Sequence, residues 1–153
     1  MKDSLRLTVA RFKARWRDNA SPLVSIMIAT YNRGDLLASR TIPSILAQSY
    51  SNFELIIVGD ACTDDTEKLV RAFTDPRIRF ENLAERGVYP ENPLYRWMVA
   101  GTVPINRALA MSQGDWIAYI DDDDIWTPDH LDVLLAAARH HPAARSRAAG
   151  RGV

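Results

Sequence analysis

The sequence has little that would tie it to nucleic acid, a membrane interior or a disulfide framework. Cys62 is the only cysteine, which excludes an internal disulfide and fits a reducing compartment. The 19 basic and 19 acidic residues cancel, so no global charge attracts nucleic acid. No apolar run approaches the roughly 20 residues that span a bilayer, and no secretory signal peptide is recognisable. We therefore expect one cytoplasmic globular domain, because 153 residues provide one proper core and hardly two.

The sequence also lacks the two common glycine-rich phosphate-binding motifs. No Gly-x-Gly-x-x-Gly follows the first apolar segment at 23–29, and no Gly-Lys-Ser/Thr is present. These absences disfavour the dinucleotide-binding and P-loop classes of protein. The absence of a basic, glycine-rich loop after that segment likewise disfavours a nucleotidyltransferase.

What the chain does contain is an alternation of apolar strands and amphipathic helices. Repeated β-α-β units with right-handed crossovers predict an α/β fold with a doubly wound, mainly parallel, Rossmann-like sheet. Residues 83–103 carry several glycines and prolines and are expected to form a long loop. Thr127 is expected to cap a last helix, with Pro128 at its first position and Leu134 on its buried face. The expected strands are residues 23–29, 53–58, 77–80 and 115–120.

The two ends differ in composition from the body at 21–139. Residues 1–20 place apolar side chains on one helical face and basic side chains on most of the remainder. Such a helix either docks on its own domain or makes peripheral contact with an anionic membrane surface. Residues 140–153 have no apolar periodicity and are expected to form a disordered tail.

The strand expected at 115–120 ends in four consecutive carboxylates, Asp121 to Asp124. Four like charges repel one another unless a cation lies among them. Ligands of open α/β sheets bind beyond the carboxyl ends of the strands, and Asp60 follows the second strand at that same edge. Hard oxygen ligands suit Mg²⁺ or Mn²⁺ shared with a phosphate-bearing substrate. The alternative interpretation is a solvated acidic turn.

The order and spacing of several segments resemble the family 2 glycosyltransferases, which have the GT-A fold. Any one segment is a weak signal, but the ordered set over roughly residues 23–135 is strong. The matching segments are V-S-I-M-I-A-T-Y-N-R at 24–33, S-I-L-A-Q-S-Y at 44–50, F-E-L-I-I-V at 53–58, G-D-A-C-T-D-D-T at 59–66, N-R-A-L at 106–109, G-D-W-I at 114–117 and D-D-D at 121–123.

The resemblance implies a nucleotide-sugar site. Asp60 would accept a hydrogen bond from the base, usually the uracil of a uridine diphosphate sugar, and Ala29 and Tyr31 would line the base pocket. Asp122 would reach the ribose. Asn106, in the segment that resembles the family's asparagine-bearing helix, completes the expected nucleotide-sugar site.

The resemblance also implies a divalent metal, Mn²⁺ or Mg²⁺. Asp123 would hold the ion that bridges the diphosphate, with Asp121 nearby as a second ligand. The ion would neutralise charge that develops on the departing diphosphate, which is a Lewis-acid role. The expected activity is inverting transfer of a sugar from a nucleotide-diphosphate sugar to an unknown acceptor.

Two departures from the family pattern qualify this expectation. Gly59 stands where the family has the first aspartate of a pair, and Ala61-Cys62 replaces the usual Gly-Ser. In the family, the acceptor site and the catalytic base lie after the metal motif, where this chain soon stops. We therefore expect a truncated GT-A fold without its catalytic base. The alternative is a non-catalytic remnant that binds nucleotide and metal.

Overall fold

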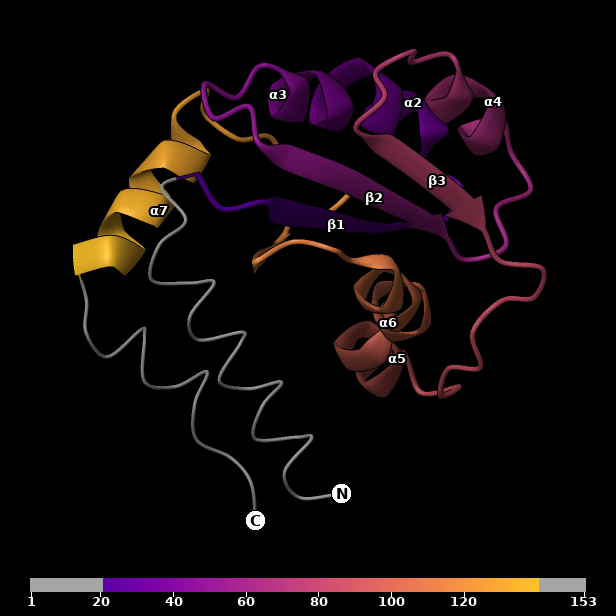
Figure 1. The fold of residues 1–153 in the computed structure, drawn as a ribbon. Coiled ribbons are helices and arrows are strands. Elements are labelled where there is room, and N and C mark those ends of the chain that lie inside the picture. Colours follow the sequence, from indigo (N-terminus) through magenta and orange to yellow (C-terminus); the bar gives the residue numbers. More distant parts are fainter. Residues whose placement is uncertain (1–20, 141–153) are drawn as a thin grey trace, which may run out of the picture.

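The computed structural model describes residues 21–140, and its centre is a four-stranded, fully parallel sheet (Figure 1). The strands β1 (Val24–Thr30), β2 (Phe53–Gly59), β3 (Ile78–Asn82) and β4 (Trp116–Tyr119) lie in the order β3-β2-β1-β4. The chain moves outward from β1 to β3 and then returns to the other side of β1. The strand order therefore reverses beside β1, where ligands of open α/β sheets bind. The predicted helix at 1–20 and the tail beyond residue 140 lie outside the described residues.

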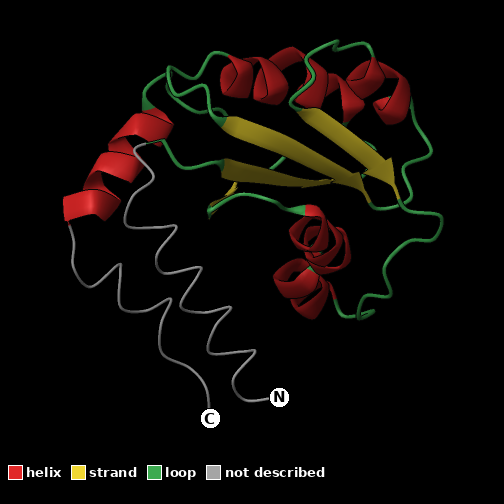
Figure 2. Ribbon diagram, viewed as in Figure 1, coloured by secondary structure: helices red, strands yellow, loops and turns green. Residues whose placement is uncertain are grey.

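Helices cover both faces of the sheet, as Figures 1 and 2 show, so the doubly wound α/β prediction is confirmed. Ile26 and Ile28 of β1 point to one face, and Met27 points to the other, because side chains alternate along a strand. No helix among residues 21–140 is long and apolar enough to cross a bilayer. The first face carries α2 (Gly34–Leu36), the π-helix η1 (Leu37–Thr41), α3 (Ile42–Leu46), α4 (Thr66–Arg71) and part of α7 (His130–His140), and the second carries α6 (Thr102–Met111), with α5 (Pro93–Val99) beyond it.

The prediction of a long loop at 83–103 is wrong, because this segment contains α5 and the first residues of α6. The Asn92 side chain accepts hydrogen bonds from the backbone N–H groups of Leu94 (3.0 Å) and Tyr95 (3.3 Å), which caps α5. Pro93 and Pro104 lie in the first turns of α5 and α6, where a missing N–H costs nothing. Proline content suggested that no helix forms here, whereas proline in the first turn of a helix is compatible with helix formation.

The predicted start of the last helix at Thr127 and Pro128 is also wrong, because α7 begins at His130. The Thr127 carbonyl accepts a hydrogen bond of 2.7 Å from Gln48 Nε2, and Leu131 N–H donates to Gln48 Oε1. Gln48 thus replaces the expected cap and joins α7 to α3. Leu134, expected in the core, is exposed, because the buried face of α7 carries residues four apart, Leu131 and Leu135.

Candidate functional site

The carboxyl ends of β1, β2 and β4 meet at one edge of the sheet. Thr30 pairs with Gly59 in the register of β1 and β2, and Asp60 N–H donates to the Thr30 carbonyl at 2.8 Å. On the other side of β1, Ile120 N–H donates to the Met27 carbonyl at 3.3 Å. Asp60 and the acidic run, Asp121 to Asp124, therefore follow strands that flank β1 directly. The sequence predicted that these polar ends share the carboxyl edge, and the strand order adds that β1 lies between them.

A tight turn after β1 sets the direction of Arg33. Asn32 has a left-handed backbone, with a φ of 52°, a conformation that asparagine tolerates better than most residues. Its side chain accepts a hydrogen bond from Thr63 N–H at 2.8 Å and donates one to Thr63 Oγ1 at 3.1 Å. These contacts hold the turn against the loop that follows β2, and Arg33 leaves the turn toward the acidic run.

Arg33 supplies the cation that the four carboxylates require. Its Nη1 atom lies 2.5 Å from Asp123 Oδ2 and 3.3 Å from Asp122 Oδ1. The charge of Asp122 and the hydrogen bond to Asp123 raise the pKa of the guanidinium, which therefore stays charged. Sequence analysis missed this role, because 89 residues separate Arg33 from Asp122.

Asp122 is the buried member of the acidic run. Burial raises the pKa of its carboxyl, and the charges of Asp123 and Asp121 act in the same direction. Arg33 and the nearby Thr30 hydroxyl lower it only in part. The Thr30 hydroxyl lies close enough to influence Asp122, yet it makes no hydrogen bond of normal geometry within the described part of the chain. The folded protein thus holds a carboxylate that is poorly neutralised.

The Thr41 side chain fixes the backbone of the acidic run. Its buried hydroxyl lies 2.9 Å from both the Asp122 and the Asp124 carbonyl oxygens and shares one proton between them. Thr41 ends the π-helix η1, a local widening that often occurs at functional sites. A period of 3.6 residues does not predict such a widening, so the sequence gave no signal for Thr41. Its effect is to hold the backbone of Asp122 and Asp124 in place.

Asp60 is buried, and each of its carboxylate oxygens accepts a hydrogen bond. Its Oδ1 accepts from Gly87 N–H at 2.8 Å, its Oδ2 accepts from the Tyr89 hydroxyl at 2.9 Å, and Arg86 Nε lies 3.6 Å away. Burial, and then the hydrogen bond to Asp60, raise the pKa of Tyr89 to about 12. The Arg86 guanidinium also stacks on the Tyr31 ring, 3.5 Å from its centroid. Residues 86–89 therefore contact both polar members of the predicted base pocket.

The other predicted residues are less closely joined. Ala29 is half-buried near the end of β1 and lies against Gly101, just before α6. Asp121 is exposed and accepts a hydrogen bond from the Tyr119 hydroxyl. Asn106 is exposed on α6, and within residues 21–140 no hydrogen bond or ion pair joins it to the rest of the site.

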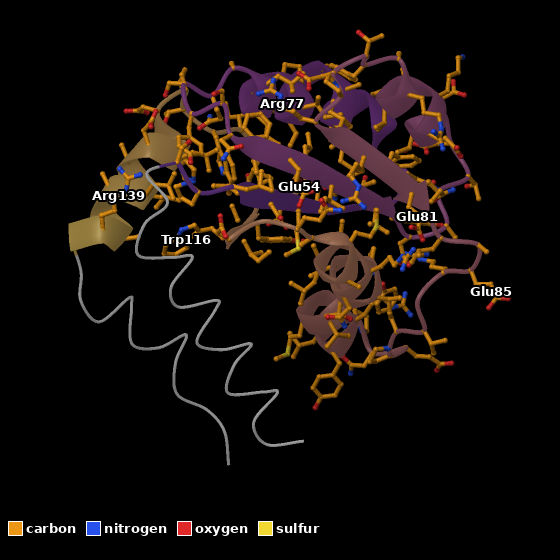
Figure 3. All side chains as sticks on the ribbon, viewed as in Figure 1. Glu54, Arg77, Glu81, Glu85, Trp116 and Arg139 are labelled. Carbon is orange, nitrogen blue, oxygen red and sulfur yellow. The ribbon has the colours of Figure 1, made fainter. Side chains whose placement is uncertain are left out.

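Another buried carboxylate, Glu54, belongs to the framework (Figure 3). Burial favours its neutral form, but hydrogen bonds from Ser25 Oγ (2.6 Å), Gln113 N–H (2.6 Å) and Arg79 Nη1 (3.0 Å) together lower its pKa. All these partners are internal, so Glu54 has a structural role. It fastens β1, β3 and the segment after α6 to β2.

The acidic run fits a divalent ion that is shared with a substrate. Within residues 21–140, no three His, Cys, Asp or Glu side chains converge as a complete metal site. Mg²⁺ and Mn²⁺, however, commonly take one or two carboxylates and complete their shell with phosphate oxygens and water. Asp121 and Asp123 provide exposed carboxylates of this kind, and Arg33 already marks the position as one that attracts a cation.

Comparison with known proteins identifies the relatives of this chain. The sequence family described as "Glycosyltransferase like family 2" matches residues 21–149. The putative colanic acid biosynthesis glycosyl transferase WcaA of Escherichia coli is 40% identical over 119 residues, which are 76% of this chain and 38% of that protein. The chain spans less than half of the length of the curated relatives that it matches.

Solved structures share the fold. The Staphylococcus aureus protein TarS, residues 1–349 in complex with UDP-GlcNAc, aligns with a TM-score of 0.63 and 22% identity over 77% of this chain and 31% of that one. The mannosyltransferase PcManGT of Pyrobaculum calidifontis, in complex with GDP-Man and Mn²⁺, aligns with a TM-score of 0.60 and 25% identity over 89% of this chain and 40% of that one. This chain thus has the fold of the N-terminal part of GT-A enzymes.

Proposed function

Because the chain belongs to the family 2 glycosyltransferases, we propose that its carboxyl edge binds a nucleotide-diphosphate sugar together with Mn²⁺ or Mg²⁺ for inverting sugar transfer. The observation that carries the proposal is the meeting of two polar strand ends at this edge. Asp60 follows β2, the acidic run follows β4, and both strands pair with β1. One nucleotide-sized ligand can reach the ends of all three strands at the same time.

The base end of the proposed site is formed by Tyr31 and Asp60, with Ala29 beside them. The Tyr31 ring offers a face for stacking, which Arg86 now covers. Asp60 offers a carboxylate that accepts hydrogen bonds and discriminates among bases through their N–H groups. Selectivity for uridine is proposed to depend on Asp60, while stacking on Tyr31 is tolerant of the base. Asn106 on α6 is proposed to approach the donor from the other face.

The ribose and diphosphate end is formed by the acidic run. Asp122 is proposed to accept a hydrogen bond from a ribose hydroxyl, which would relieve a carboxylate that is buried and poorly neutralised. Asp121 and Asp123 are proposed to hold the divalent ion, which supplies charge neutralisation for the departing diphosphate when bound. Thr41 holds the neighbouring Asp122 and Asp124 carbonyls, which keeps the loop that carries both carboxylates in place.

The choice of donor follows the family resemblance and the neighbours. TarS is described with UDP-GlcNAc and PcManGT with GDP-Man and Mn²⁺, and both share this fold. We favour a uridine diphosphate sugar, and we assign no acceptor and no catalytic base to residues 21–140. A binding role without transfer is the second candidate, because the polar strand ends offer groups for a nucleotide and an ion, and no catalytic base is assigned among residues 21–140.

Calorimetric titration with UDP, with and without Mn²⁺, tests the proposal. We expect UDP to bind only weakly without Mn²⁺ and markedly more tightly with it, while CDP and GDP bind less well than UDP. Hydrolysis of a UDP-sugar in the same samples separates an active enzyme from a binding protein. Failure of every nucleoside diphosphate to bind in a Mn²⁺-dependent manner would refute the proposed site.

A further inference from the structure

The contact between Arg33 and the acidic run is a single-point contact. Within the described residues, one nitrogen, Nη1, makes both the 2.5 Å contact to Asp123 and the 3.3 Å contact to Asp122. A guanidinium binds carboxylates most strongly through two parallel hydrogen bonds from two nitrogens. The Arg33 and Asp123 side chains are also each 48% exposed, so water competes for the pair. The contact is therefore easily exchanged.

The neighbouring carboxylates nevertheless favour a nearby cation, because like charges repel one another. Asp122 is only 12% exposed in its side chain, with Asp121 and Asp123 as neighbours in the sequence. Without Arg33, no nearby cationic side chain of the described residues would offset the repulsion among these carboxylates. No other ion pair to Asp121, Asp122 or Asp123 is found within residues 21–140. Arg33 thus does in the ligand-free protein what a metal ion would do in the loaded one.

A divalent ion bound to Asp123 would compete with Arg33 for this carboxylate. The ion lies about 2.1 Å from its ligating oxygen, and two cations on one carboxylate repel each other, which weakens the contact that Arg33 makes. The released Arg33 would remain on its turn at the end of β1, beside the position proposed for the diphosphate. Its planar fork suits phosphate oxygens as well as it suits carboxylates.

On the basis of the proposed function, we propose that Arg33 is an exchangeable counter-ion of Asp122 and Asp123. It occupies these carboxylates in the absence of ligand and moves to the diphosphate when ion and nucleotide bind together. Binding of the ion alone would strand Arg33 next to a like charge, whereas the diphosphate gives it a new partner. Arg33 therefore couples metal binding to nucleotide binding, and each strengthens the other.

The test measures two affinities in the full chain. Mn²⁺ binding without nucleotide is followed by the spin-resonance signal of free Mn²⁺, and UDP binding at saturating Mn²⁺ is followed by calorimetry. In Arg33→Gln we expect Mn²⁺ alone to bind roughly fivefold or more tighter, and UDP to bind roughly fivefold or more weaker. Arg33→Lys keeps the charge but not the fork, so its Mn²⁺ affinity should stay near that of the parent while UDP affinity falls.

A matched control is Arg71→Gln on α4. Arg71 pairs with Glu67 at 2.8 Å, and the two side chains are 61% and 49% exposed, much like the Arg33 pair. This variant loses the same charge and should leave both affinities unchanged. Loss of UDP affinity in Arg33→Gln without a gain in Mn²⁺ affinity would overturn the exchange, because Arg33 would then be a phosphate ligand only. If the parent itself shows no Mn²⁺-dependent UDP binding, the proposed function fails first.

Discussion

The Tyr89 hydroxyl donates a 2.9 Å hydrogen bond to Oδ2 of the buried Asp60, the side chain predicted to contact a nucleotide base. The other carboxylate oxygen accepts from Gly87 N–H. A base that reached the buried Asp60 would compete with these donors for the lone pairs of its carboxylate. Tyr89 is the donor that can move, because a side-chain hydroxyl leaves more easily than the backbone N–H of Gly87, which is part of the chain.

Tyr89→Phe is therefore expected to tighten UDP binding. The substitution leaves Asp60 Oδ2 buried without its donor, which costs the ligand-free protein about 1–3 kcal/mol, and a base N–H can restore the bond. We expect a lower melting temperature without ligand and up to roughly tenfold tighter UDP binding in Mn²⁺, measured by calorimetry. Tyr95→Phe, an exposed position on α5, is the matched control. Weaker or unchanged UDP binding by Tyr89→Phe would show that Asp60 does not exchange partners.

Thr41→Val should destabilise the protein and loosen the acidic run. The change removes the hydroxyl that serves the Asp122 and Asp124 carbonyls and keeps the shape of the side chain. We expect a loss of about 1–3 kcal/mol in the free energy of unfolding by urea, because buried acceptors lose their donor. Thr41→Ser retains the hydroxyl and should recover most of this loss. Equal stability of the valine and serine variants would show that the Thr41 hydroxyl does not stabilise the fold.

Asp75 should make the protein sensitive to acid. Hydrogen bonds from Arg77 lower the pKa of its carboxyl from 3.8 to about 2. A carboxyl whose pKa is lower in the folded state stabilises the fold above the unfolded pKa and loses this effect as the pH falls through the folded pKa. We expect this contribution, about 2 kcal/mol, to be present at pH 6 and to disappear between about pH 4 and pH 2.

Asp75→Asn separates this effect from the other carboxylates. The variant should be less stable than the parent at pH 6, and the two should converge toward pH 2, in urea titrations at a series of pH values. The Arg77 side chain also stacks on Phe53, 4.2 Å from the ring centroid, and this contact is independent of pH. A constant difference between the two proteins over the whole range would contradict the assignment to Asp75.

The sheet and the meeting of its polar strand ends were predictable, because they depend on local signals. Apolar strands of the right period ended in Gly59-Asp60 and in Asp121, and parallel pairing then brought those ends together. Arg33, Thr41 and Tyr89 were not predictable in this way. Each acts on a partner that lies 29 residues or more away along the chain, so only the folded topology reveals the contact.

Local signals also misled where one residue type serves two purposes. Pro93 and Pro104 suggested a loop, but proline is tolerated in the first turn of a helix as well as outside one. Thr127 had the side chain of a cap, but its carbonyl is held by Gln48, and the helix begins at His130. The position of each proline within its helix, and the contact of Gln48 with Thr127, decided between two structures that the local sequence allows equally.

Asp123→Asn is expected to separate metal binding from folding. The Arg33–Asp123 pair is half exposed and contributes about 0–1 kcal/mol, and its loss is offset because Asp122 is freed from a like charge. The unfolding free energy without metal should therefore stay nearly constant. Mn²⁺-dependent UDP binding should fall roughly tenfold or more, since a proposed metal ligand is removed. Asp124→Asn is the matched control, because the Asp124 backbone carries its contacts to Thr41 and Asp121 while its carboxylate is exposed. Parent-like binding of Mn²⁺ and UDP by Asp123→Asn would reduce the acidic run to a solvated turn.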